Sequence, residues 1–128
     1  MGKILLVEDD PMESRLYQNL FTKEGFEVVA IDNGHDCREK TLEVKPDVIL
    51  LDIMMPKMNG LDALDVLRFD PETKKYPVII LTNLSDQHYQ DEAAKRGATM
   101  YIIKSQIENK VLVQKVRDVI GVYAPKSP

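Results

Sequence analysis

Acidic, hydroxyl and ammonium side chains stand directly after four apolar runs of this 128-residue sequence. In chain order they are Glu8, Asp9 and Asp10, then Asp52, Thr82 and Lys104. Carboxylates crowded within a few ångströms repel one another and raise one another's pKa unless a cation lies between them. A carboxylate beside a hard divalent ion, a fixed ammonium and a hydroxyl is a set of groups suited to phosphoryl transfer.

The residue types at these positions favour magnesium over a transition metal. Carboxylates, a backbone carbonyl and waters form the all-oxygen ligand set that suits Mg²⁺. Histidine and cysteine are absent from these positions, which disfavours zinc. Asp52 would then supply the nucleophilic oxygen, while the metal and Lys104 balance the charge on the phosphoryl oxygens.

The elements that must position these groups follow from the hydrophobic pattern. Short apolar runs, typical of strands buried on both faces, alternate with segments of helical period. The predicted strands are 4–7, 27–31, 48–51, 78–81 and 100–103, and the predicted helices are 11–24, 36–44, 60–68, 86–96 and 109–120. This strict alternation predicts an α/β fold, a three-layer α/β/α sandwich around a five-stranded parallel sheet.

A doubly wound sheet in the order 2-1-3-4-5, the flavodoxin-like topology, brings the chemistry together. Ligand sites in such sheets lie beyond the carboxyl ends of the strands, at a topological switch point. The first and third strands are neighbours in that order, so Glu8 and Asp9 should converge on Asp52. Asp32 and Asn33 follow the second strand, at the edge of the sheet and away from the cluster.

Composition restricts the class of protein. The net charge of −4 argues weakly against direct nucleic-acid binding, which normally needs a basic face. Apolar runs are far shorter than the roughly 20 residues of a membrane span, so we expect no membrane insertion. Cys37 has no partner for a disulfide, which favours a reducing cytoplasm. The length predicts one domain over residues 1–122, with 123–128 as a C-terminal tail or the start of a linker.

Each of these side chains also has a purely structural explanation. Asp10 directly precedes Pro11, as an N-cap followed by proline at the first helical position does. Asp52 could cap a turn, Thr82 could reflect strand propensity, and Lys104 could extend from the sheet into solvent. The joint placement of all these groups at one sheet edge favours a functional site.

Four segments carry a resemblance to a known family. They are 4–10 (ILLVEDD), 47–60 (DVILLDIMMPKMNG), Leu81-Thr82, and 97–104, which contains Tyr101 and Lys104. Together they resemble the receiver domain of bacterial two-component response regulators, and in particular the single-domain chemotaxis type. The resemblance covers residues 3–121, and the segment from Asp52 to Gly60 is its most specific part.

The resemblance implies a phosphoacceptor and a metal site. Asp52 would accept a phosphoryl group from a histidine kinase, a phosphotransfer protein or a small donor. Asp9 would bind Mg²⁺ directly and Glu8 through water, with Asp52 and the backbone carbonyl of Met54 completing the protein ligands. Asp10 would be left as the helix cap.

The resemblance also implies a switch. Thr82 would move to hydrogen-bond the phosphoryl group, Lys104 would pair with it, and Tyr101 would turn inward, which biases a two-state element. Alternatively, Tyr101 is an amphipathic ring covering the sheet edge with its hydroxyl in water. The expected output is altered protein–protein affinity at the face formed by 86–96, 100–103 and 109–120, in a monomer or a phosphorylation-dependent dimer. No enzyme activity is expected beyond the chain's own phosphoryl transfer and autodephosphorylation.

Departures from the family pattern and competing functions were weighed as well. Ser105 stands where the family usually has proline, and Asn83 stands where a small residue is typical. Met54 and Leu84 would flank the attacking water and are apolar, which predicts a slowly hydrolysed phosphoaspartate.

A haloacid dehalogenase-type phosphatase fits poorly, because Asp52 follows the third strand. A constitutive pseudo-receiver would lack an acidic ligand or the lysine, and a flavin site would meet repelling acids.

Overall fold

Five parallel strands form the centre of the computed structural model, which describes residues 2–123. The elements are β1 (Lys3–Val7), α1 (Pro11–Lys23), β2 (Glu27–Ile31), α2 (Cys37–Val44), β3 (Val48–Leu51), α3 (Gly60–Phe69), β4 (Val78–Thr82), α4 (Gln87–Lys95), β5 (Met100–Ile103), a 3₁₀ turn (Lys104–Gln106) and α5 (Asn109–Tyr123). The strand order is β2-β1-β3-β4-β5. The predicted fold class and strand order are confirmed.

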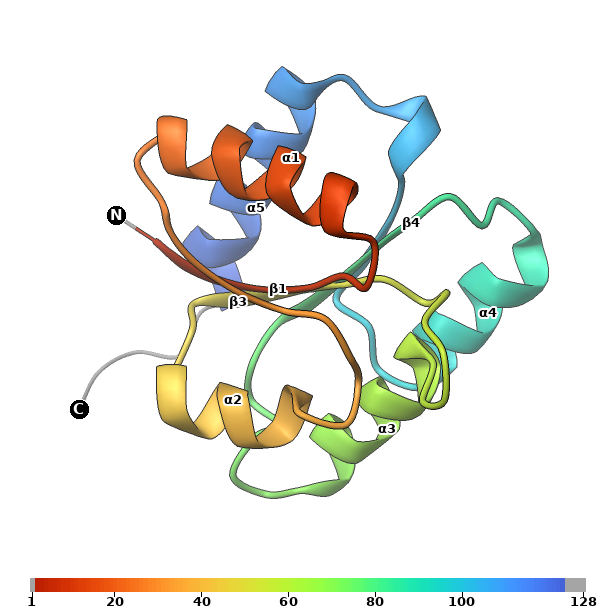
Figure 1. Ribbon diagram of the computed structural model, residues 1–128. Coiled ribbons are helices and arrows are strands. Elements are labelled where there is room, and N and C mark those ends of the chain that lie inside the picture. The colour runs from red at the N-terminus through yellow and green to blue at the C-terminus, as the bar shows by residue number, and fades with distance from the viewer. Residues whose placement is uncertain (1, 124–128) are drawn as a thin grey trace.

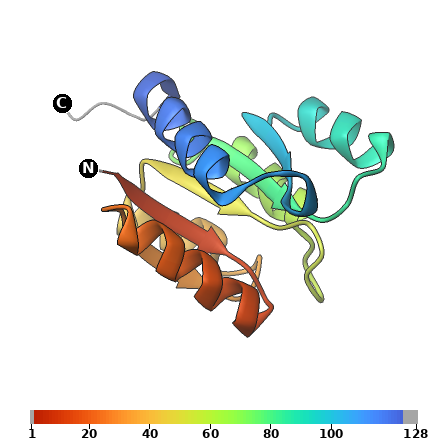
Figure 2. The same ribbon diagram turned by 90° about the horizontal axis from the view of Figure 1, so that it is seen from above.

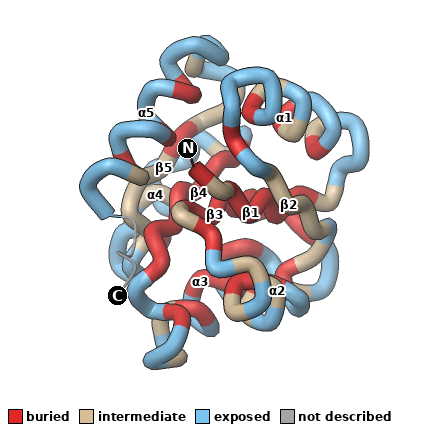
Figure 3. Tube along the Cα trace, turned by 90° about the vertical axis from the view of Figure 1, so that its left-hand side faces the viewer, coloured by how far each residue is buried: buried red, intermediate tan, exposed pale blue. Residues whose placement is uncertain are grey.

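Helices cover both faces of the sheet, which gives three layers (Figure 1). α1 and α5 lie on one face, seen from above in Figure 2, and α2, α3 and α4 lie on the other. Alternate residues of β1 divide between the two cores: Leu5 and Val7 pack toward α3, whereas Ile4 and Leu6 pack toward α1 and α5. Burial is concentrated in the strands (Figure 3). The central strands are continuously apolar because both of their faces are covered.

The turn from β3 into α3 depends on a glycine. A Cβ atom at Gly60 would lie 2.0 Å from the backbone oxygen of Asp52. The Gly60 N–H donates to the carbonyl of Ile53, and the N-cap Asn59 accepts from the N–H of Asp62. The chain that follows Asp52 is therefore folded tightly back against it.

The structure differs from the sequence-based expectations in two details. α5 continues through Gly121 to Tyr123, past the predicted end at residue 120, because helical hydrogen bonding outweighs the roughly 1 kcal/mol cost of one glycine. Residues 124–128 of the predicted tail lie outside the described residues. The charged segment 70–75 before β4 would be expected to form a solvated loop, but Thr73 is 0% exposed and its hydroxyl donates to the carbonyl of Leu67 at 2.7 Å. None of the helices within residues 2–123 is long and apolar enough to cross a membrane.

Candidate functional site

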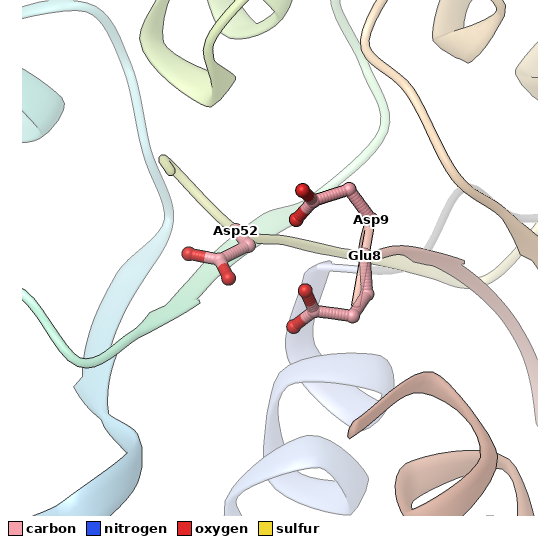
Figure 4. Close-up of side chains that lie close together, drawn as sticks. All are labelled: Glu8, Asp9 and Asp52. Carbon is pink, nitrogen blue, oxygen red and sulfur yellow. The ribbon is translucent and has the colours of Figure 1, made fainter. Parts of the chain in front are cut away.

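Three carboxylates meet at the carboxyl ends of β1 and β3 (Figure 4). Val7 and Leu51 are partners in the parallel register, so the residues that follow them, Glu8 and Asp52, lie side by side. Glu8, Asp9 and Asp52 each offer one oxygen, and these oxygens lie within 4.8 Å of one another. Glu8 is 3% exposed and Asp52 is 7% exposed. A shared all-oxygen site of this size fits a hard divalent cation.

Lys104 enters this cluster from the end of β5. Its ammonium donates to Glu8 Oε1 at 2.5 Å, to Asp52 Oδ2 at 3.0 Å and to Glu13 Oε1 at 3.2 Å. The side chain is only 5% exposed, so the alternative in which Lys104 extends into solvent is wrong. Each of the three ammonium protons has a carboxylate acceptor.

Burial and charge shift the titration of this cluster. The pKa of Glu8 is raised from 4.5 to about 7, chiefly by burial and also by the charge of Asp52, against the opposing hydrogen bonds from Lys104 and the Asp10 N–H. Burial lowers the pKa of Lys104, but the bond to Glu8 and the charge of Asp52 outweigh burial and hold that pKa above its ordinary value. Lys104 therefore remains an ammonium, while burial brings the titration of Glu8 close to neutral pH.

Asp10 caps α1. Its side chain accepts hydrogen bonds from the backbone N–H groups of Met12 at 2.9 Å and Glu13 at 3.2 Å, with Pro11 at the first helical position. The predicted structural role of Asp10 is confirmed. Its own N–H donates to Glu8 Oε2 at 3.1 Å, so the cap also orients the first acid of the cluster.

The loops after β3 and β4 complete the surroundings of Asp52. The Met54 N–H donates to Asp52 Oδ1 at 3.3 Å, while the Met54 side chain is 61% exposed. Thr82 is fully buried, and its hydroxyl oxygen accepts from the Leu84 N–H at 3.4 Å. The Tyr101 hydroxyl donates to the Leu84 carbonyl at 2.7 Å. It therefore has a protein partner, whereas the alternative explanation placed it in water.

Two groups in this site escaped the sequence analysis. Glu13 and Tyr17 lie one turn apart on α1 and both approach Lys104, with the Tyr17 ring centroid 5.8 Å from Nζ. Their spacing of four residues places them on one helix face, which was the available signal. Sequence alone could not show that this face meets the end of β5.

Comparison with known proteins matches this geometry to a family. The model of the response regulator receiver domain matches residues 4–117. The chain belongs to the response regulator receiver domain family. The chemotaxis protein CheY of Thermotoga maritima is 38% identical over 107 residues, 81% of this chain and 87% of that protein. PilH of Pseudomonas aeruginosa is 33% identical over 121 residues, 94% of this chain and 99% of that protein.

A solved receiver structure extends the comparison. The response regulator TrrA of Thermotoga maritima, in complex with Mg²⁺ and BeF, matches with a TM-score of 0.82 and 29% identity, over 93% of this chain and 99% of that chain. Ser105 lies in the 3₁₀ turn, and no cis peptide bond occurs within residues 2–123. The individual roles assigned to the site residues stay predictions.

Proposed function

We propose that this receiver domain is a phosphorylation-controlled switch in which Asp52 accepts a phosphoryl group. The donor would be a histidine kinase, a phosphotransfer protein or a small phosphodonor. The observation that carries the proposal is the position of Asp52, which lies buried beside the Lys104 ammonium and close to the acids Glu8 and Asp9. A carboxylate serving only to cap a turn would have no need of a buried ammonium and two further acids.

The bond changes follow from this arrangement. An Asp52 carboxylate oxygen forms a bond to phosphorus, and the bond from phosphorus to the donor breaks, a P–N bond for phosphohistidine or a P–O bond for acetyl phosphate. The leaving group departs with the electron pair, and Asp52 has no proton to lose because it attacks as a carboxylate. Lys104 lies 3.0 Å from Asp52 Oδ2, where it can balance charge on the transferred group.

The carboxylate cluster fits Mg²⁺ by the chemistry of its donors. Asp9 would hold the ion directly and Glu8 through water, with Asp52 and the Met54 carbonyl as further ligands. When bound, the ion neutralises the carboxylates and the charge that develops on the phosphoryl oxygens. Burial raises the pKa of Glu8, and a bound cation would offset that effect by favouring the charged carboxylate.

The output would be a change in affinity for another protein in the cytoplasm. Thr82 would hydrogen-bond the phosphoryl group and draw on the loop whose Leu84 carbonyl binds the Tyr101 hydroxyl. That contact links the site to the face made by α4, β5 and α5, the predicted partner surface. Phosphorylation would bias a two-state arrangement of this loop, with or without dimerisation.

Apolar side chains beside Asp52 favour a long-lived phosphoryl group. Met54 and Leu84 line one cavity of 390 Å³ together with Tyr89. Neither Met54 nor Leu84 can orient an attacking water by hydrogen bonding. Replacing either by alanine should shorten the phosphoryl lifetime, and a longer lifetime would count against this blocking role.

The deciding experiment is labelling with acetyl phosphate and Mg²⁺, read by intact-protein mass. Wild type should gain one hydroxylamine-sensitive phosphoryl group, and the Asp52→Asn variant should gain none. Asp10→Asn is the matched control, because it removes a neighbouring carboxylate and keeps a side chain that can cap α1. Equal labelling of Asp52→Asn and wild type, or no labelling of wild type, would show that Asp52 is not the phosphoacceptor.

A further inference from the structure

Glu13 is the one acid bound to Lys104 that neither the metal site nor the phosphoacceptor accounts for. It lies on α1, 91 positions from Lys104 in the sequence, and its carboxylate accepts from the ammonium at 3.2 Å. Its side chain is 38% exposed, so it stands at the rim of the pocket rather than inside it. Lys104 is therefore shared between two buried acids and one acid at the mouth.

The N-terminus of α1 leaves Glu13 free for this contact. Glu13 is the third residue of the helix, where a glutamate commonly reaches back to the backbone N–H of the N-cap residue. Here that N–H, of Asp10, donates to Glu8 Oε2 at 3.1 Å instead. The backbone of Glu13 is held by its own bond to the Asp10 side chain at 3.2 Å. The backbone of Glu13 is thus fixed, while its carboxylate points away from its own helix and toward Lys104.

Tyr17 gives the same helix face a second contact with the ammonium. Its ring centroid lies 5.8 Å from Lys104 Nζ, and the residue is buried. A ring at this distance attracts a cation and restricts where it can move. α1 therefore contributes a charge and an aromatic wall to one side of Lys104.

We propose that Glu13 is a positioning residue that holds the buried Lys104 ammonium from the mouth of the pocket and competes for it with the phosphoryl group on Asp52. This inference rests on the proposed function of Asp52. An ammonium makes three hydrogen bonds, and Glu8, Asp52 and Glu13 take all three in this structure. Oxygens of a phosphoryl group on Asp52 must replace at least one of these acceptors, and Glu13 opposes that replacement.

The two ligands of the pocket should respond to Glu13 in opposite directions. The Glu13 charge draws Lys104 away from Glu8 and Asp52 and attracts a divalent cation. The same charge holds Lys104 back from an anionic group on Asp52. The Glu13→Gln variant should therefore bind Mg²⁺ about three- to tenfold more weakly, and bind trifluoroberyllate, an analogue of the phosphoryl group, about three- to tenfold more tightly.

Calorimetric titration of the whole chain measures both affinities, with Mg²⁺ alone and then with trifluoroberyllate at saturating Mg²⁺. Asp32→Asn is the matched control, since Asp32 lines the same open cavity as Glu8 and Asp9 but makes no bond to Lys104 in the described residues. It should change either affinity less than twofold. General damage to the fold would weaken the binding of both Mg²⁺ and trifluoroberyllate to Glu13→Gln, and that result would overturn the proposal.

A double-mutant cycle tests whether Glu13 acts through Lys104 or merely through its charge. In a Lys104→Met background, adding Glu13→Gln should leave the trifluoroberyllate affinity within about twofold of that of Lys104→Met alone. A full effect that persists without Lys104 would overturn the positioning role. Failure of wild type to bind trifluoroberyllate would contradict the assignment of Asp52, whereas normal wild-type binding that Glu13→Gln leaves unchanged would contradict the role of Glu13 alone.

Discussion

Two cations, the buried Lys104 and the partly buried Arg68, lie near opposite ends of the parallel strands, and their partners differ. Lys104 binds side-chain carboxylates beyond the carboxyl ends of the strands. Arg68, near the end of α3, donates to the backbone carbonyls of Gly97 at 2.9 Å, Lys74 at 3.1 Å and Tyr76 at 2.7 Å. These carbonyls belong to the segments that lead into β4 and β5.

The difference in partners gives the two cations different roles. Burial lowers the pKa of Arg68, since neutral carbonyls compensate its charge only in part. The carboxylates around Lys104 hold its pKa above the ordinary value. Carboxylates can exchange an ammonium for a metal ion or give it up to a phosphoryl group, whereas backbone carbonyls before a strand have no such alternative. Arg68 therefore fixes structure, and Lys104 belongs to an arrangement that ligands can change.

Lys104 with its carboxylate partners is called the Lys104 region below, and Arg68 with its carbonyl partners is called the Arg68 region. The largest effect is expected at Gly60, which lies against the backbone of Asp52 in the Lys104 region. Gly60→Ala would place a Cβ atom 2.0 Å from the backbone oxygen of Asp52, with no flexible side chain to move aside. We expect a loss of about 3 kcal/mol or more in the free energy of unfolding, measured with urea, together with weakened Mg²⁺ binding.

Gly121→Ala is the matched control for Gly60→Ala. Gly121 lies within α5, and a Cβ atom there would have no neighbour within 4 Å. Alanine should stabilise the protein by about 0.5–1 kcal/mol at this position and leave Mg²⁺ affinity unchanged. If Gly60→Ala unfolded at the same urea concentration as wild type, the close approach of α3 to the Asp52 backbone would be wrong.

The next largest effect separates the two cations directly. Arg68→Ala leaves three carbonyls without their donor and should lower the free energy of unfolding by about 2–3 kcal/mol. Labelling of the folded protein by acetyl phosphate should stay within about twofold of wild type. Lys104→Met should do the opposite and lose most of its trifluoroberyllate affinity with a smaller change in stability.

A stability loss in Lys104→Met as large as that in Arg68→Ala would remove the distinction between the two regions. Arg68→Lys serves as the control for charge, because a lysine keeps the positive charge and lacks the planar fork that reaches several carbonyls. It should recover only part of the lost stability. Full recovery would mean that charge, rather than hydrogen bonding to the three carbonyls, is what Arg68 contributes.

The sequence allowed more to be predicted about the Lys104 region than about the Arg68 region, for a physical reason. Parallel strands bring their carboxyl ends to one edge, so the period of the apolar runs was enough to bring Glu8, Asp9 and Asp52 together. The Arg68 contacts depend on the path of the irregular chain before β4, where no repeating pattern limits the backbone. The same limit explains why the burial of Thr73 was not predicted.

Side-chain reach between elements was the other limit. The contact of Glu13 with Lys104 joins residues 91 apart, and it depends on how α1 sits over the sheet. The exposure of Met54 depends on which way one loop residue turns, and hydrophobicity alone does not determine that direction. Apolar pattern places elements, but it does not orient single side chains in loops.

A smaller effect should appear in the pH dependence of stability in the metal-free protein. The pKa of Glu8 is raised from 4.5 to about 7 in the folded state, so the folded protein keeps a proton that the unfolded chain has lost. The free energy of unfolding should therefore fall by about 1–2 kcal/mol as the pH rises from about 4.5 to 7. Urea unfolding in a chelator measures this slope.

The slope assigned to Glu8 has two checks. Glu8→Gln removes the titrating group and should flatten the curve over the same pH interval. Saturating Mg²⁺ favours the charged acids, so stability should then rise with pH instead of falling. A metal-free curve that rises between pH 4.5 and 7 would show that Lys104 compensates Glu8 fully and that the site does not lack positive charge.

The smallest effect concerns Gly97, which lies beside Arg68. Its φ of +92° is a conformation that a side chain strains, and an added Cβ atom would meet Arg68 Nε at 3.2 Å. We expect Gly97→Ala to lower the free energy of unfolding by about 1–2 kcal/mol. Part of this loss comes from backbone strain and part from displacing the Arg68 guanidinium. In an Arg68→Ala background the second part disappears, so the cost should drop to the backbone part of about 1 kcal/mol. Mg²⁺ and trifluoroberyllate affinities should be unchanged in both backgrounds, because the Arg68 region holds structure only. An equal cost in both backgrounds would mean that Arg68 yields freely to the new methyl group, and a changed Mg²⁺ affinity would mean that the two regions communicate across the sheet.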